Sequence, residues 1–70
     1  MKYEVMQMVL NSKLEFFYTD SDYKSRKFFF LKKGKKLNNL VSKIHDIVLN
    51  NHGKFEFFIN GNQTVVKVSE

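Results

Sequence analysis

The most regular pattern of apolar positions lies in the middle of the chain. Apolar residues there lie three, four and seven positions apart, the spacing of one helical stripe: Leu37, Leu40, Val41, Ile44, Ile47 and Val48. Gly34 can break the preceding strand, and Gly53 stands where a left-handed C-terminal cap is expected. The pattern predicts an amphipathic helix from about Lys36 to about Asn51.

Alternation near the beginning of the chain predicts a β-hairpin. Val5, Gln7 and Val9 alternate with their neighbours, and after Asn11-Ser12 a second alternating run contains Leu14, Phe16 and Tyr18. With Asn11 and Ser12 as the loop, we expect Met6, Met8 and Phe17 to lie on the outer face of this hairpin.

Alternation near the end of the chain predicts a second hairpin. The first apolar series is Phe55, Phe57 and Ile59, and the returning series is Thr64, Val66 and Val68. If Gly61-Asn62 form the loop, these residues pair in the order Ile59–Thr64, Phe57–Val66 and Phe55–Val68. Phe58 and Val65 are then expected on the outside.

A further strand is expected at Lys27 to Lys32, after a polar loop at residues 20–25. Either Phe29 or Phe30 should face outward from this strand.

The fold class that follows is α+β, one domain over residues 1–70, with an antiparallel sheet of about five strands in the order β-β-β-α-β-β. One amphipathic helix covers one face and the other face stays open. This element order is similar to that of the double-wing DNA-binding domain of a phage transcription activator, without shared residues.

Length and composition narrow the classes of protein. Seventy residues leave little room for a deep substrate cavity, and the absence of cysteine excludes a disulfide framework. No apolar run approaches the length of a membrane span, so we expect a cytoplasmic protein, in a bacterium or in the host if phage-encoded. The abundance of lysine and asparagine is typical of AT-rich genes and suggests a low-GC bacterium, a phage or a mobile element.

Positive charge is concentrated in one part of the sequence. Between Tyr23 and His45 there is no acidic residue, and eight residues are basic: Lys24, Arg26, Lys27, Lys32, Lys33, Lys35, Lys36 and Lys43. We call this stretch the basic window. The four lysines around Gly34 are expected at a strand-to-helix junction, where free helical N–H groups also attract anions. Clustered lysines predict binding to nucleic-acid phosphate, DNA or RNA, and the single arginine predicts low sequence selectivity.

Several apolar side chains have no place on the helix-facing side of the predicted sheet. They are Met6, Met8, Phe17, Phe29 (or Phe30) and Phe58. Small proteins rarely leave this much apolar surface in water, so a homodimer or another protein partner is expected to cover it, and stacked nucleobases are the alternative.

No arrangement of residues indicates catalysis. The acidic residues fall mostly on outward strand positions, and neither His45 nor His52 has an expected partner that would make a metal site or a catalytic pair. We therefore predict no enzyme activity, no metal and no cofactor. The leading hypothesis is a nucleic-acid-binding accessory factor. One alternative is an inhibitor or modulator that binds a host or defence enzyme, for example one with a nucleic-acid-binding groove. A third reading, based on the open sheet and a possible dimer, is a structural or assembly subunit.

Overall fold

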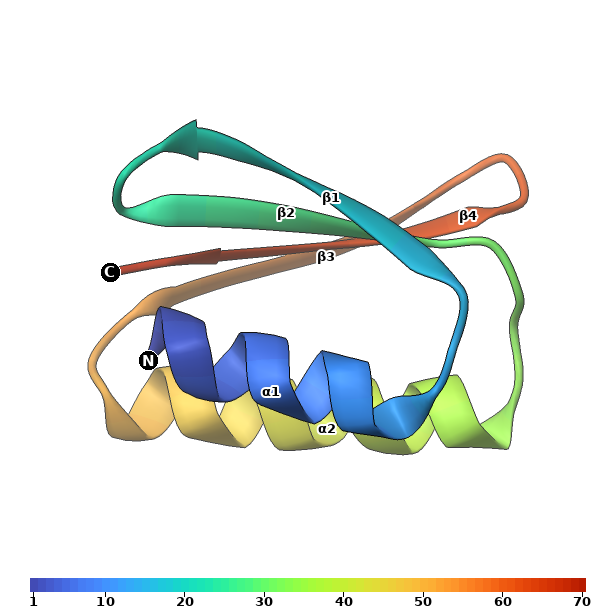
Figure 1. Ribbon diagram of the computed structural model, residues 1–70, viewed down its shortest axis with the longest axis horizontal. Coiled ribbons are helices and arrows are strands. Elements are labelled where there is room, and N and C mark those ends of the chain that lie inside the picture. Colours follow the sequence, from blue (N-terminus) through green and yellow to red (C-terminus); the bar gives the residue numbers. More distant parts are fainter.

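The computed structural model describes residues 1–70 and shows two αββ units in succession. The first contains α1 (Lys2–Ser12), β1 (Phe16–Asp22) and β2 (Ser25–Phe30). The second contains α2 (Lys35–Asn50), β3 (Lys54–Asn60) and β4 (Gln63–Ser69). The strands form one antiparallel sheet in the order β1-β2-β4-β3, and both helices cover the same face of it (Figure 1). The class α+β and the antiparallel sheet are confirmed, whereas the sheet has four strands and the chain has two helices.

The predicted first hairpin is wrong, because residues 2–12 form α1. Val5 and Val9 are one helical turn apart, and both are fully buried against the sheet and α2. The alternation that suggested a strand included the polar Gln7, which is exposed. With α1 in place of a strand, the element order no longer matches that of the double-wing domain.

The segment expected to be a polar loop belongs to a hairpin instead. β1 continues to Asp22, and Tyr23-Lys24 form a tight turn into β2. β2 runs over Ser25–Phe30 rather than over Lys27 to Lys32. Phe28 and Phe30 enter the core, so Phe29 is the residue that faces outward.

The second unit is close to its prediction. α2 covers Lys35–Asn50, within one residue of the expected helix at either end, and it buries Leu37, Leu40, Ile44 and Val48. The final hairpin has the predicted register, with Ile59 opposite Thr64 and Phe55 opposite Val68.

The end of α2 differs from the prediction in one detail. The residue with left-handed backbone is His52, at a φ of 58°, and not Gly53. Gly53 is needed for a different reason. A Cβ atom there would lie 2.6 Å from the carbonyl oxygen of Ser69 and 2.8 Å from the sulfur of Met1, so only glycine fits between the end of β4 and the start of α1.

The core lies between the helices and one face of the sheet. Its buried members come from both helices and from the two central strands: Val5, Val9, Phe28, Phe30, Leu37, Leu40, Ile44, Val48, Val66 and Val68. The opposite face carries no helix, as predicted, and we call it the open face (Figure 1). None of the helices is both long and apolar enough to span a bilayer.

Candidate functional site

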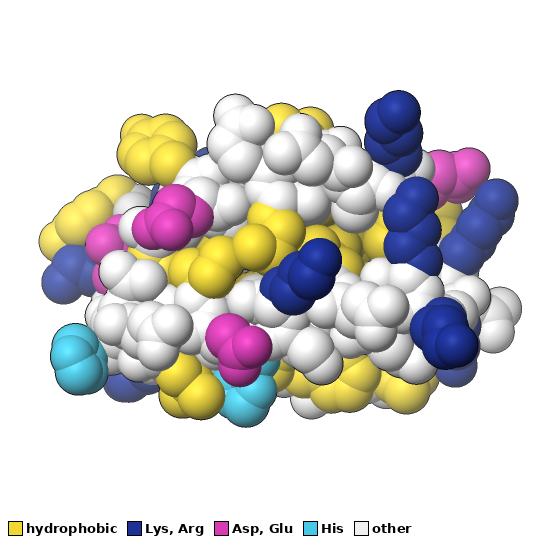
Figure 2. Space-filling model, turned by 90° about the horizontal axis from the view of Figure 1, so that it is seen from below, with side chains coloured by type: hydrophobic (Ala, Val, Ile, Leu, Met, Phe, Trp, Pro, Cys, Tyr) yellow, Lys and Arg dark blue, Asp and Glu magenta, His cyan; other side chains and the backbone are white.

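One end of the molecule gathers lysines from two separate parts of the sequence. Lys32 and Lys33 follow β2, and Lys35 and Lys36 begin α2. Lys13, which follows α1, lies at the same end, because the strand that begins just after it pairs with the end of β2 through Phe16 and Phe30. All five side chains are exposed, and we call this group the basic end. Figure 2 shows lysine side chains crowded at this end of the helix side.

The start of α2 adds hydrogen-bond donors to the basic end. Gly34 is the N-cap residue and provides no side-chain cap, and the first intrahelical bond runs from the N–H of Asn38 to the carbonyl of Gly34. The N–H groups of Lys35, Lys36 and Leu37 therefore have no protein acceptor. Together with the partial positive charge of the helix N-terminus, they reinforce the attraction of the lysines for an anion.

Few acidic groups neutralise the basic end. Lys32 lies 3.7 Å from Glu15 in an ion pair whose two side chains are largely exposed. Such surface pairs are weak. The other four lysines have no carboxylate within ion-pair distance. The positive charge at this end is thus available to a ligand.

Arg26 belongs to the basic window but not to the basic end. It donates two hydrogen bonds to Asp20, at 2.7 Å from Nε to Oδ1 and 3.1 Å from Nη2 to Oδ2, and its guanidinium lies over the ring of Tyr18. The hydrogen bond from Arg26 lowers the pKa of Asp20, and the same bond raises the pKa of Arg26. The only arginine of the chain is therefore already paired.

Three further lysines of the basic window also lie elsewhere. Lys24 is in the turn at the opposite end of β2, where its ammonium is 5.4 Å from the ring of Tyr23. Lys27 is on the open face, opposite Lys67. Lys43 is on α2, at the rim of a groove between the helices. The sequence therefore predicted the junction lysines as one group, but it could not show that Lys13 joins them and that Lys24, Arg26 and Lys27 do not.

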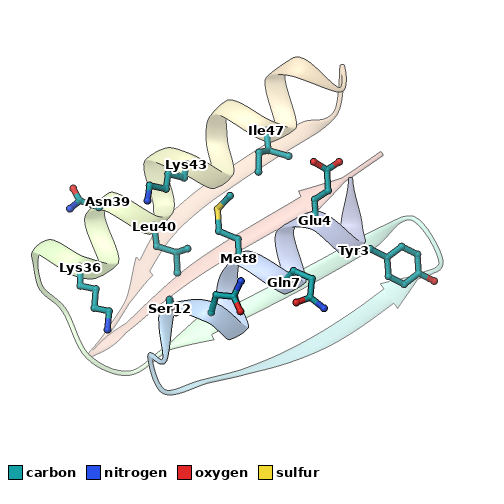
Figure 3. Close-up of a pocket in the computed structure, with 11 residues that line it drawn as sticks. Tyr3, Glu4, Gln7, Met8, Ser12, Lys36, Asn39, Leu40, Lys43 and Ile47 are labelled. Atoms are coloured by element: carbon teal, nitrogen blue, oxygen red, sulfur yellow. The ribbon is translucent and has the colours of Figure 1, made fainter.

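The groove between α1 and α2 has a volume of about 770 Å³. Figure 3 shows Met8 from α1 pointing toward Leu40 and Ile47 from α2. These three side chains form the apolar part of the groove lining. Lys36 and Lys43 line one wall. Lys36 therefore belongs both to the groove and to the basic end, so the positive surface continues into the groove.

An apolar row crosses the open face from one edge of the sheet to the other. Direct cross-strand neighbours make up this row in the order Phe17, Phe29, Val65 and Phe58. Phe17 and Phe58 are each nearly half exposed, whereas Val65 is buried between its neighbours. The rings of Phe17 and Phe29 stack on each other at 4.8 Å, so their facing surfaces are not free to receive a nucleobase.

Met6 and Met8 do not belong to this apolar row, contrary to the prediction. Both lie on α1, are partly buried and pack against the core. The error follows from the strand that was expected over these residues, because strand alternation placed them on the outer face. Phe17, Phe29 and Phe58 do share the open face, as predicted.

The structure brings no group of three or more histidine, cysteine or acidic side chains together. His45 packs its ring against Phe55, with 4.6 Å between ring centroids, and His52 is exposed at the end of α2. Comparison of the chain with protein-family models, with curated proteins and with solved structures gives no match.

Proposed function

We propose that this protein binds the phosphate backbone of nucleic acid through the basic end, with low sequence selectivity. The observation that supports this most directly is the convergence of five lysines around the start of α2, four of them without an acidic partner. Lysine is a compact cation that attracts phosphate without reading base edges. Because Arg26 is held by Asp20, the side chain best suited to bidentate recognition of guanine is not free.

The test compares two variants with the same net charge. One replaces Lys32, Lys33, Lys35 and Lys36 with glutamine. The control variant replaces four lysines outside the basic end, also with glutamine: Lys24, Lys27, Lys54 and Lys67. Each substitution removes one positive charge, so both variants fall from +5 to +1. Fluorescence anisotropy with labelled single- and double-stranded oligonucleotides, at several salt concentrations, measures affinity and its salt dependence.

Binding by the wild-type protein should weaken steeply with salt, because binding to phosphate releases counterions. The variant of the basic end should lose most of its affinity, and the control should keep most of it. Equal losses in both variants would show that net charge alone drives binding. Absence of wild-type binding at low salt would contradict the proposal.

The second candidate is a protein that inhibits or modulates a host or defence enzyme. The apolar row favours this candidate, since its stacked phenylalanine pair suits a protein surface better than a nucleobase. In that case the basic end docks onto an acidic or nucleic-acid-binding groove of the target. A pull-down from host lysate after nuclease treatment separates the two candidates, because loss of every partner would leave only nucleic acid as the ligand.

A further inference from the structure

β3 is an unprotected edge of the sheet. Its residues include Phe57 and Ile59 on the helix side and Phe58 on the open face, and all three are exposed by between 44% and 57%. The register of β3 with β4 is unbroken from Lys54 to Asn60, with no bulge. A long, regular edge with apolar side chains on both faces is a template for pairing with another strand.

The other edge, β1, is protected in two ways. Its register with β2 shifts between Asp20 and Asp22, which is a β-bulge that disturbs further pairing. The same segment carries charge, since Asp20 binds both Arg26 and Lys2. The contrast between the edges indicates that β3 is the edge available to a partner.

The backbone of β3 has hydrogen-bonding groups without a strand partner. In a hairpin with a two-residue loop, the pair that closes the loop is hydrogen-bonded, and bonded and non-bonded pairs then alternate. Here the closing pair is Asn60 and Gln63. The alternation leaves the N–H and C=O groups of Phe55, Phe57 and Ile59 directed away from β4, where a further strand would bind them.

We propose that a second copy of this chain occupies this edge, with the two β3 strands antiparallel and Phe58 on the two-fold axis. In this register Phe57 is opposite the partner's Ile59, Phe58 is opposite the partner's Phe58, and Glu56 is opposite the partner's Asn60. From Glu56 to Asn60, every apolar side chain is opposite an apolar side chain and every polar side chain is opposite a polar one. No like charges are opposed. A register with Phe57 on the axis would instead place Glu56 opposite the partner's Phe58.

This register also extends a feature of the single chain. The apolar row ends at Phe58 on the β3 edge, so the partner's Phe58 continues it into the second molecule. The result is an eight-stranded sheet with one apolar row across its whole open face. On the other face, Phe57 and Ile59 become covered by their counterparts. This dimer does not depend on nucleic-acid binding by the basic end.

Disulfide crosslinking tests the register directly, because the chain has no cysteine of its own. A directly opposite, non-hydrogen-bonded antiparallel pair has Cα atoms about 4.5 Å apart, within the range that a disulfide spans. Phe58→Cys should therefore form a covalent dimer rapidly on mild oxidation. The matched control is Phe17→Cys, which is on the same open face with 48% exposure against 44% for Phe58, but at the protected edge. It should remain mainly monomeric.

Two crosslinking results would overturn the proposal. Crosslinking of Phe17→Cys as fast as Phe58→Cys would mean that collisions rather than an interface form the bond. Crosslinking of Phe57→Cys in preference to Phe58→Cys would exclude the proposed register. Circular dichroism of each variant checks that it is folded.

Sedimentation of the unmodified protein provides an independent test. The wild type should change from monomer to dimer between micromolar and submillimolar concentration. Ile59→Lys should stay monomeric, since it places a charge against the partner's Phe57. The control Leu10→Lys is on α1 and changes a side chain of similar exposure, 52% against 57%, so it should dimerise like the wild type. A wild type that is monomeric throughout would contradict the proposal.

Discussion

Lys27 and Lys67 stand directly opposite each other on the two central strands, both on the open face. Like charges in this position destabilise a sheet. Glu56, the neighbour of Lys67 on β3, gives only one of the two lysines a nearby carboxylate. The pair lies in the row next to the apolar row, so the open face carries two adjacent lysines beside its apolar row.

Replacing Lys27 with glutamate should therefore stabilise the protein. The change converts a repulsive pair into an attractive one, and we expect the free energy of unfolding to rise by about 0.5 kcal/mol. Urea denaturation at low ionic strength measures this difference, which should shrink as salt is added. Lys24→Glu, in an exposed turn, should have a smaller effect, and an equal gain there would point to net charge instead.

Stability should depend on the ionisation of Asp20. Its pKa is lower in the folded protein than its ordinary value because Arg26 donates a hydrogen bond to its carboxylate. A carboxyl group with a lowered pKa adds stability above its unfolded pKa and loses that stability as the pH falls through its folded pKa. On acidification, Asp20→Asn should therefore lose less stability than the wild type.

The size of this effect should be small, since Asp20 is exposed to solvent. An NMR titration gives the sharper measurement. In the Arg26→Gln variant, the pKa of Asp20 should move back toward its ordinary value. An unchanged titration of Asp20 would mean that the contact with Arg26 does not persist in solution.

The turn after α2 predicts opposite effects at two adjacent positions. His52→Gly should stabilise the protein by about 0.5 kcal/mol, because His52 has left-handed backbone that glycine adopts more easily. Gly53→Ala should destabilise it by about 1–3 kcal/mol, because the new methyl group would overlap the carbonyl of Ser69. Thermal or urea denaturation measures both. Tolerance of alanine at position 53 would contradict the tight contact between β4 and α1.

Single substitutions in the basic end should change the salt dependence of oligonucleotide binding. Each phosphate contact contributes about 0.9 to the slope of log K against log salt for duplex and about 0.7 for a single strand. Lys33→Gln should lower the slope by about that amount, whereas Lys24→Gln should leave it unchanged. An unchanged slope for Lys33→Gln would mean that Lys33 contacts no phosphate.

The second αββ unit was predictable because its local patterns agree with its packing. Six apolar residues at helical spacing can bury one face only as a helix, and the glycine and asparagines between Ile59 and Thr64 specify a tight hairpin. The first unit was not predictable in the same way. Val5 and Val9 are compatible with a strand or a helix, and packing against α2 and the sheet decides between them.

The candidate site was predictable only where it is contiguous in sequence. Lys32 to Lys36 come together because they adjoin the same junction. Lys13 joins them through the pairing of β1 with β2, which the incorrect first hairpin concealed. The pairing of Arg26 with Asp20 also depends on that register. Counting basic residues along the sequence therefore overestimates the number of cationic side chains that are free to bind a ligand.

The order of strands has a consequence for the way the sheet is assembled during folding. β4 follows every other element in the chain, yet it lies between β2 and β3 and supplies Val66 and Val68 to the core. Until β4 is in place, the two units have no shared sheet, and β2 and β3 present unpaired edges with adjacent phenylalanines. Folding is therefore completed by placing a strand in the centre of the sheet rather than at its margin, and an intermediate in which β4 is not yet in place is prone to associate through these two edges.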